Sequence, residues 1–400
     1  MARLSPTNTI ILAGAVVLSL SFGVRSIFGV VLEPISLEYN WPREVFSLSL
    51  AIQNIVWGLA QPFFGMIADR LGDRRALWIG LAIYIAGMAL STVGFLPWMQ
   101  HLGAGVLVGM GVAGTAFGLV LSVVGRATPE EKRSKALALT AALGALGQMV
   151  LPVIAGLTTE AYGWQGTMVL MTLLLLPIAA CIPFLKAEIP AGSQPEPAVP
   201  MQEMLRRAFG HSSYVLLTMG FFVCGFHVAF IAAHFPTYVA EVCGSVTLGA
   251  ATLSIIGFAN VVGTLLAGQL GARYPKPWIL SAIYALRAVV ILVFISVPPT
   301  PLTVVIFSMS MGVLWLSTVP LTTALVATMF GTRALGTLYG IVFVGHQVGS
   351  FLGVWLGGRV YDMTGTYDMV WYIAIALGIF SAIVHLPVRD RAWTPSAAPA

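Results

Sequence analysis

Charged side chains are scarce in this chain. Of its 400 residues, 20 are Lys or Arg and 15 are Asp or Glu, which together make up 9% of the chain. A soluble protein carries about 25% charged residues and needs them to cover its surface. Cysteine is scarce as well, with three residues in the chain. Their number is odd and their spacing does not match a metal site, so neither a disulfide framework nor a metal site is indicated. These deficits exclude soluble enzymes, nucleic-acid-binding proteins and secreted disulfide scaffolds.

Apolar residues are abundant instead, at 58% of the chain, before its 42 glycines are counted. About 20 apolar residues are enough to cross the hydrocarbon core of a bilayer as a helix. The sequence therefore predicts an all-α membrane protein with twelve transmembrane helices. We expect them near residues 9–32, 46–67, 76–95, 100–125, 135–158, 166–185, 213–239, 246–270, 277–296, 302–328, 335–358 and 367–387. The first is too long for a signal peptide and lacks a small-residue cleavage site.

The longest break between apolar segments lies in the middle of the chain and is rich in proline. It divides the chain into an N-terminal six-helix bundle at 1–186, a linker at 187–212 and a C-terminal six-helix bundle at 213–400. The end of the linker, residues 201–211, reads as a short basic amphipathic helix on the membrane surface.

Lys and Arg predict the orientation, because they gather in cytoplasmic loops. With both termini in the cytoplasm, sixteen basic residues fall inside and only Arg43 and Arg359 fall outside. We therefore expect a multi-pass protein of the cytoplasmic (inner) membrane with both termini cytoplasmic. The two remaining basic residues, Arg25 and Arg287, lie within predicted spans.

The two halves of the sequence repeat each other weakly. A shift of about 200 residues pairs Gly23 with Gly225, Arg25 with His227, Phe28 with Phe230, Pro34 with Pro236, Trp78 with Trp278 and Tyr84 with Tyr284. Parallel repeats of this kind bind substrate near the midplane, between the halves.

A motif lies between the second and third spans, in the sequence Gly65-Met-Ile-Ala-Asp69-Arg70-Leu-Gly72-Asp-Arg74-Arg75. It matches the loop motif of the major facilitator superfamily, which the whole chain resembles in span count, linker and orientation. The resemblance implies that Gly65, Asp69, Arg70, Gly72, Arg74 and Arg75 serve gating. The second copy of the motif, at 268–276, is degenerate.

Within that superfamily, residues 23–29, 41–43 and 345–367 resemble the bacterial monocarboxylate-porter-like branch. Those porters carry an acid–arginine pair on span eight. Here that span offers Asn260 and Thr264 instead, with no charge between 246 and 271. The substrate chemistry of the branch is therefore not carried over intact.

Arg25 and Arg287 are cations in spans that hold no acid near the midplane. An Arg at a helix centre costs roughly 2.5–3.5 kcal/mol and normally faces a bundle interior or an aqueous cavity. Because a carboxylate would neutralise such a site through charge-assisted hydrogen bonds, we expect an anion. For Arg287 a structural role, with bonds to carbonyls of adjacent helices, is an equal alternative.

Other polar side chains on the predicted spans are candidate substrate contacts, with helix–helix hydrogen bonding as the alternative for each. They are His227, His346, Asn260, Asn54, Gln148 and Tyr339. Histidine titrates near physiological pH and is also a candidate proton carrier.

The sequence predicts a secondary active transporter of a small organic anion, a monocarboxylate, by alternating access with proton symport. Anion exchange and drug or metabolite efflux are the alternatives within the same class, and a sensor built on this fold is an alternative outside it. We expect a monomer in the lipid bilayer with no cofactor, metal or nucleic-acid partner. The sequence contains no motif for a nucleophile–base pair or a phosphate-binding loop, so we do not expect an enzyme.

Overall fold

The computed structural model describes residues 5–115, 117–186, 206–330 and 335–391, which are almost entirely helical. Eleven helical segments in these ranges are long and apolar enough to cross a membrane. One of them, Leu139–Phe184, has 46 residues, about twice the length that one crossing needs. Its backbone breaks at Gly163, where φ is 73°, a value that glycine adopts without strain. The fifth and sixth predicted spans are therefore one segment divided at Gly163.

The first half of the chain contains six spans, several of which are interrupted. Its helices are α1 Pro6–Ser26, α2 Phe28–Glu38, α3 Arg43–Leu71, α4 Asp73–Val93, α5 Pro97–Gln100, the π-helix His101–Leu107, α6 Val108–Thr115, α7 Phe117–Arg126, α8 Glu130–Leu173, α9 Leu176–Cys181 and the 3-10 turn Ile182–Phe184. Helices α1 and α2 together form the first span, which is interrupted at Ile27.

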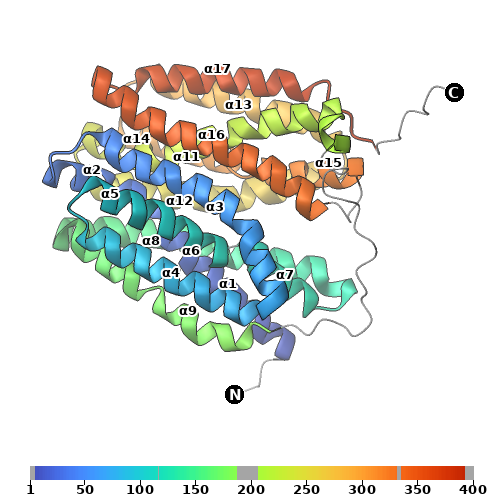
Figure 1. Cartoon of the computed structure of the whole chain (residues 1–400). Helices are drawn as coiled ribbons and strands as arrows, with labels where there is room; N and C mark the ends of the chain where they lie inside the picture. The colour runs from blue at the N-terminus through green and yellow to red at the C-terminus, as the bar shows by residue number, and fades with distance from the viewer. Residues whose placement is uncertain (1–4, 116, 187–205, 331–334, 392–400) are drawn as a thin grey trace.

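The second half follows the same plan. Its helices are α11 Ser212–Cys243, α12 Val246–Gly271, α13 Lys276–Ile295, α14 Pro301–Leu314, α15 Thr318–Phe330, α16 Leu335–Thr364 and α17 Asp368–His385. In Figure 1 the long axes of the helices in both halves lie roughly along one common direction, as in a bundle that crosses a bilayer. Most of the predicted linker, residues 187–205, lies outside the described residues, and so does the first part of the surface helix expected at 201–211.

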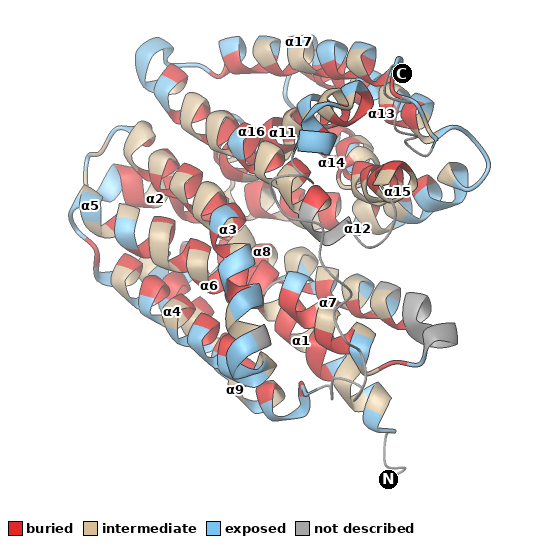
Figure 2. Cartoon of the chain, turned by 45° about the vertical axis from the view of Figure 1, so that its right-hand side comes forward, coloured by how far each residue is buried: buried red, intermediate tan, exposed pale blue. Residues whose placement is uncertain are grey.

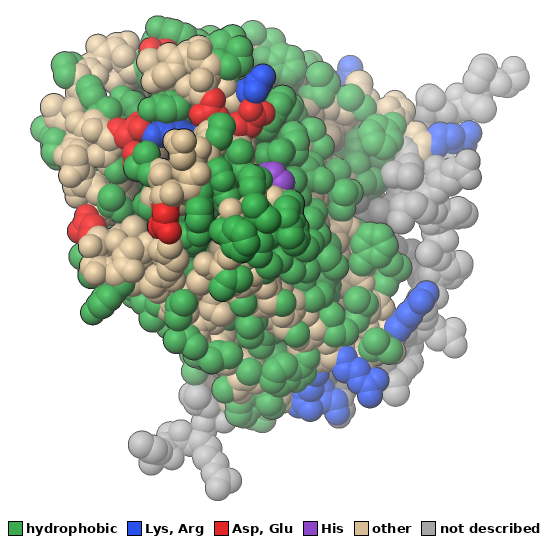
Figure 3. Space-filling model, turned by 60° about the vertical axis from the view of Figure 1, so that its left-hand side comes forward, with side chains coloured by type: hydrophobic (Ala, Val, Ile, Leu, Met, Phe, Trp, Pro, Cys, Tyr) green, Lys and Arg blue, Asp and Glu red, His purple; other side chains and the backbone are tan. Residues whose placement is uncertain are grey.

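The surface of the molecule is apolar where lipid would contact it. Buried residues face the interior of each half in Figure 2, and Figure 3 shows hydrophobic side chains over most of the visible face. Large apolar side chains such as Trp78, Leu286, Val293 and Phe380 are exposed. A soluble monomer rarely exposes apolar side chains over most of one face, so this surface is consistent with a membrane-spanning protein.

The two halves contact each other mainly through α3 with α16, α8 with α12, and α2 with α11, and α2 also touches α12. Some glycines are placed where helix backbones approach most closely. A Cβ on Gly29 of α2 would collide with the Ala232 carbonyl of α11, and one on Gly225 of α11 would collide with the His346 carbonyl of α16. By contrast, a Cβ on Gly268 of α12 would meet nothing within 4 Å.

These contacts predict opposite effects for two identical substitutions. Gly225→Ala forces α11 away from α16, so we expect a loss of about 1–3 kcal/mol in stability and a lower Tm in detergent. Gly268→Ala fills open space in a helix and should leave the Tm unchanged or raise it, since alanine favours a helix by about 0.5–1 kcal/mol over glycine. Thermal denaturation followed by intrinsic fluorescence measures both. Equal Tm values for the two variants would contradict this account of the packing.

Candidate functional site

Arg25 lies in the last turn of α1, two residues before the interruption at Ile27. The hydroxyl of Ser26 donates a hydrogen bond to the Gly23 carbonyl at 2.7 Å. It satisfies one of the acceptors that the end of the helix leaves free. A cation at a helix C-terminus is favoured by the helix dipole. The interruption of the first span therefore contributes to holding a positive charge inside the bundle.

The guanidinium of Arg25 is held by neutral groups. Its Nη2 donates to Asn54 Oδ1 on α3 at 2.5 Å, and Asn54 Nδ2 donates in turn to the Leu50 carbonyl at 2.9 Å. The guanidinium carbon lies 4.9 Å from the ring centroid of Trp57, which gives a cation–π contact. Its Nε is buried with no hydrogen-bond partner among the described residues. Arg25 therefore keeps both its charge and donor capacity.

The second half meets this group through α16. Gln347 Nε2 donates to the Asn54 carbonyl at 2.8 Å, and Phe343 packs edge-on against Trp57 at 5.2 Å between ring centroids. Next to Gln347, the His346 ring hydrogen-bonds through Nδ1 to Gln347 Oε1 at 3.1 Å. We call Arg25, Asn54, Trp57, His346 and Gln347 the central polar cluster.

The structure thus brings together three of the predicted site residues, Arg25, Asn54 and His346. Sequence reasoning did not select Trp57, although it lies three residues after Asn54 and therefore on the same face of α3.

Arg287 lies elsewhere, fully buried inside the second half. Its Nε and Nη2 donate to the Leu314 carbonyl at 3.1 and 2.6 Å, and Nη2 also donates to the Trp315 carbonyl. These carbonyls end α14, where the tenth span is interrupted before α15 begins at Thr318. The contacts of Arg287 match the structural alternative stated for it.

Asn260 accepts a hydrogen bond from the backbone of the same interruption between α14 and α15. Its Oδ1 accepts from the backbone N–H of Leu316 at 2.9 Å and from the Thr264 hydroxyl at 3.3 Å. Arg287 and Asn260 therefore satisfy, respectively, the acceptors and a donor that the broken helix would leave free in the membrane.

Three further candidates have contacts outside the central polar cluster. His227 Nε2 bonds the Ala374 carbonyl of α17 at 2.7 Å, so this ring faces the helix behind it in its own half. Gln148 is partly buried, and its backbone lies where α8 packs on Gly257 of α12. Tyr339 is partly buried and packs 6.2 Å from Phe221 between ring centroids.

The loop motif lies at the turn between α3 and α4. Gly72 has φ 90°, a conformation that favours glycine, and it ends α3 before α4 starts at Asp73. Asp73 forms an ion pair with Arg126 at 2.6 Å, and Arg74 donates to the Pro183 carbonyl. Arg70 and Arg75 are exposed, whereas the Asp69 side chain lies outside the described residues. A Cβ on Gly65 would meet nothing within 4 Å.

The opposite end of the molecule is held together by Arg43, the first residue of α3. Its guanidinium forms an ion pair with Glu241 of α11, lies 3.5 Å from Glu33 of α2 and stacks 3.7 Å from the ring centroid of Tyr361. Its Nη1 donates to the Tyr367 hydroxyl at 2.8 Å. Burial raises the pKa of Tyr367, so this hydroxyl remains protonated.

Asp362 of α16 completes this junction from the other half. Its carboxylate accepts from the backbone N–H groups of Arg43 at 2.9 Å and Glu44 at 2.7 Å, so it caps the start of α3. Glu44 is paired in turn with Arg359 at 2.8 Å. We call Arg43, Glu44, Glu241 and Asp362 the Arg43 network.

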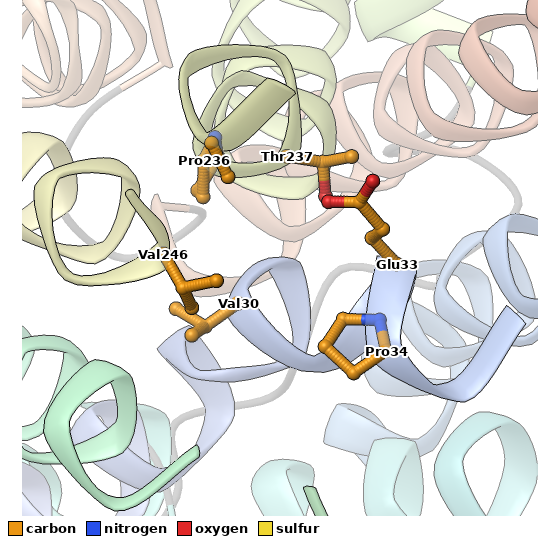
Figure 4. A pocket seen from close by; sticks show the side chains of 7 residues that line it. Val30, Glu33, Pro34, Pro236, Thr237 and Val246 are labelled. Carbon is orange, nitrogen blue, oxygen red and sulfur yellow. The ribbon is translucent and has the colours of Figure 1, made fainter. Parts of the chain in front are cut away.

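The repeat-related prolines Pro34 and Pro236 line one small cavity near this network, between α2 and α11. Its volume is about 10 Å³, room for about one water molecule. Figure 4 shows the Glu33 side chain directed toward Thr237 across it. The halves are therefore tightly closed at the Arg43 end.

The fold and the site define a class of protein. Two related halves that span the membrane, with an arginine from one half meeting polar groups of the other, are the arrangement of a membrane transporter. The chain belongs to the Major Facilitator Superfamily, whose family model matches residues 14–353 and 245–399.

Its relatives are transporters of different kinds. The chain is 26% identical over 380 residues to "Uncharacterized MFS-type transporter YcxA" of Bacillus subtilis, covering 92% of this chain and 91% of the relative. It is 24% identical to "Monocarboxylate transporter 13" of Bos taurus, with 89% and 83% covered. It is also 24% identical to "Multi-drug resistance efflux pump PmrA" of Streptococcus pneumoniae, with 85% and 84% covered.

Among solved structures, the nucleoside transporter NupG superposes with a TM-score of 0.78 at 13% identity, covering 95% of this chain and 99% of that one. This similarity shows the fold. Together the comparisons identify a membrane transporter rather than an enzyme.

The Arg43 network predicts how the closed end opens. Arg43→Gln removes hydrogen bonds to charged groups, each worth about 1.5–3 kcal/mol, and leaves Glu241 without its cation. We expect a maleimide to label a cysteine at Val30→Cys about tenfold faster in this variant, measured in detergent after replacement of the three native cysteines.

Arg391→Gln changes an exposed arginine beyond the far end of α17 and outside the loop motif, so it is the matched control and should leave the labelling rate unchanged. If Arg43→Gln labels no faster than Arg391→Gln, the network does not hold this end closed.

Proposed function

We propose that the protein is a secondary active transporter that moves a small organic anion, a monocarboxylate, by alternating access with proton symport. The observation that carries this proposal is the state of Arg25. Its buried guanidinium is bound by an amide and an aromatic ring, and its Nε has no hydrogen-bond partner among the described residues.

The electrostatics favour an anionic substrate. Asn54 and Gln347 carry no charge, and the sequence has no Asp or Glu between Glu44 and Asp69 on the helix that meets Arg25. A carboxylate replacing Asn54 at the guanidinium would form charge-assisted, bidentate hydrogen bonds. A cationic substrate would be repelled by the same group.

The position of the cluster suits alternating access. Gln347 links the halves through the Asn54 carbonyl, so a substrate at Arg25 would lie where the two halves meet. On the Arg43 side the halves are closed by ion pairs, whereas Gly65 and Gly268, at the other ends of α3 and α12, have open space around them. We infer that rocking the halves would close the glycine side and release the Arg43 network.

We propose the cytoplasmic (inner) membrane as the location, with both termini cytoplasmic and the Arg43 network outside. The distribution of Lys and Arg supports this orientation. In Figure 3 the visible acidic side chains gather near one end of the molecule, whereas several Lys and Arg side chains lie near the other.

Two alternatives remain within the transporter class. Anion exchange needs no proton carrier and suits a site that contains a cation and no acid. Efflux is favoured only by the similarity to PmrA. The similarity to monocarboxylate transporter 13 supports the organic anion.

Uptake of labelled C2–C6 carboxylates into proteoliposomes tests the proposal. We expect an imposed pH gradient to drive accumulation. Trans-stimulation without pH dependence would indicate exchange instead, and transport of a cationic compound but of no carboxylate would refute the anion site.

Arg25 predicts a graded mutational effect. Loss of hydrogen bonds to a charged group costs about 1.5–3 kcal/mol, so Arg25→Ala should raise the KM for the carboxylate by roughly 10–150-fold. Arg25→Lys keeps the charge but loses the bidentate geometry and should have an intermediate KM. Arg391→Ala changes an exposed arginine outside both the cluster and the loop motif, and it serves as the control. A KM for Arg25→Ala equal to that of the control would exclude Arg25 from the binding site.

A further inference from the structure

Arg287 is a fully buried cation, and among the described residues no carboxylate pairs with it. The sequence has no Asp or Glu between Glu241 and Asp362, and none between Asp368 and Asp390, so no acid comes from the interior of α12 to α15 or α17. Carbonyls of Leu314 and Trp315 solvate the guanidinium but do not neutralise it. Its Nη1 has no hydrogen-bond partner among the described residues.

A thiol lies against this guanidinium. Cys224 of α11 is fully buried, and its Sγ lies 3.6 Å from Arg287 Nη2 and 3.2 Å from the Thr318 hydroxyl. Thr318 is the first residue of α15, a helix of 13 residues, so the positive end of that helix lies near the sulfur. A neighbouring guanidinium and a helix N-terminus are the surroundings in which a cysteine ionises.

The first half contains a matching contact without the charge. There Ser21 of α1 bonds Thr115 at the end of α6 at 2.7 Å, just as Cys224 bonds Thr318. The repeat places Gly87 where the second half has Arg287. A cation and an ionisable thiol therefore occur together in one half and are both missing from the corresponding positions of the other.

His346 connects the thiol to the central polar cluster. Its backbone carbonyl packs against Gly225 of α11, the residue after Cys224, and its ring is stacked on Phe343 at 5.6 Å between centroids. Because Gln347 donates its Nε2 to the Asn54 carbonyl, its Oε1 must accept from His346 Nδ1. Nε2 is then the ring nitrogen able to take a proton from the thiol.

We propose that Cys224 is the thiolate counter-ion of Arg287 and shares an exchangeable proton with His346, forming the proton-binding site of the carrier. Without the proton, the thiolate and Arg287 cancel. Uptake of one proton, onto sulfur or onto His346 Nε2, gives this group a net charge of +1 and adds to the attraction that Arg25 exerts on an anion. No redox step is involved.

None of the other titratable groups around the thiol among the described residues is a better counter-ion for Arg287. The titratable groups nearby are Tyr284 on α13, Tyr339 on α16, His227 on α11 itself and His385 of α17, which stacks on Tyr284. A phenol ionises less readily than a thiol, with reference pKa values of about 10 and about 8.5, and histidine supplies no anion. Cys224 is thus the group that can best neutralise Arg287.

Infrared spectroscopy tests the thiolate directly, without any transport. In a protein that retains Cys224 but carries Cys181→Ala and Cys243→Ala, we expect no S–H stretching band at neutral pH. On acidification we expect an S–H band if the proton settles on sulfur, or an imidazolium band if it settles on His346. A protein that retains only Cys243 is the control and should show its S–H band throughout. A full S–H band for Cys224 at neutral pH would overturn the proposal.

Transport tests the coupling, which rests on the proposed function. Cys224→Ser reproduces the Ser–Thr contact of the first half with a hydroxyl that does not ionise. In Cys224→Ser we expect the ratio of gradient-driven accumulation to equilibrium exchange to fall at least about tenfold. Thr115→Ser in the first half is the control and should leave the ratio unchanged. An unchanged ratio in Cys224→Ser would exclude this proton site. If the unsubstituted protein moves no anion, the proposed function fails, while the infrared result still decides the state of Cys224.

Discussion

Two guanidinium groups lie in the interior of a protein that offers them almost no carboxylate, and the surrounding structure is arranged around that constraint. A charge in a membrane interior is tolerated only where polar groups replace water. Arg25 is solvated by an asparagine amide and an indole ring, and Arg287 by backbone carbonyls and a thiol. The amide and the indole leave the charge of Arg25 in place. This remaining charge is the basis for proposing an anionic substrate.

Interrupted helices are the second element of this design, and they occur beside both arginines. The first span is interrupted next to Arg25, and the tenth span is broken beside Arg287. A broken helix leaves backbone groups that need partners in a membrane. Arg287 and Asn260 provide those partners from neighbouring spans, whereas Arg25 keeps a buried Nε–H without a partner among the described residues.

The sequence predicted the class of fold correctly, because twelve apolar segments and a bias of positive charge leave few arrangements. It also selected Arg25, Asn54 and His346, which the structure brings together. The roles of His227 and Arg287 could not be read from their span positions, since the rotation of a helix decides whether a side chain faces the other half or its own. Trp57, Cys224 and the Arg43 network were not selected, because their importance lies in partners that are distant in sequence.

Asp362 caps the first turn of α3 from the other half of the molecule, and Glu44 beside it pairs with a half-exposed Arg359. Water can take over each of these bonds when the halves separate, as it does at the ends of many surface helices. The free-energy difference between the closed and the open junction is then small, although the bonds themselves are numerous. A carrier with two end states of nearly equal free energy can turn over quickly in either direction, and the gradients across the membrane decide the direction of net flow.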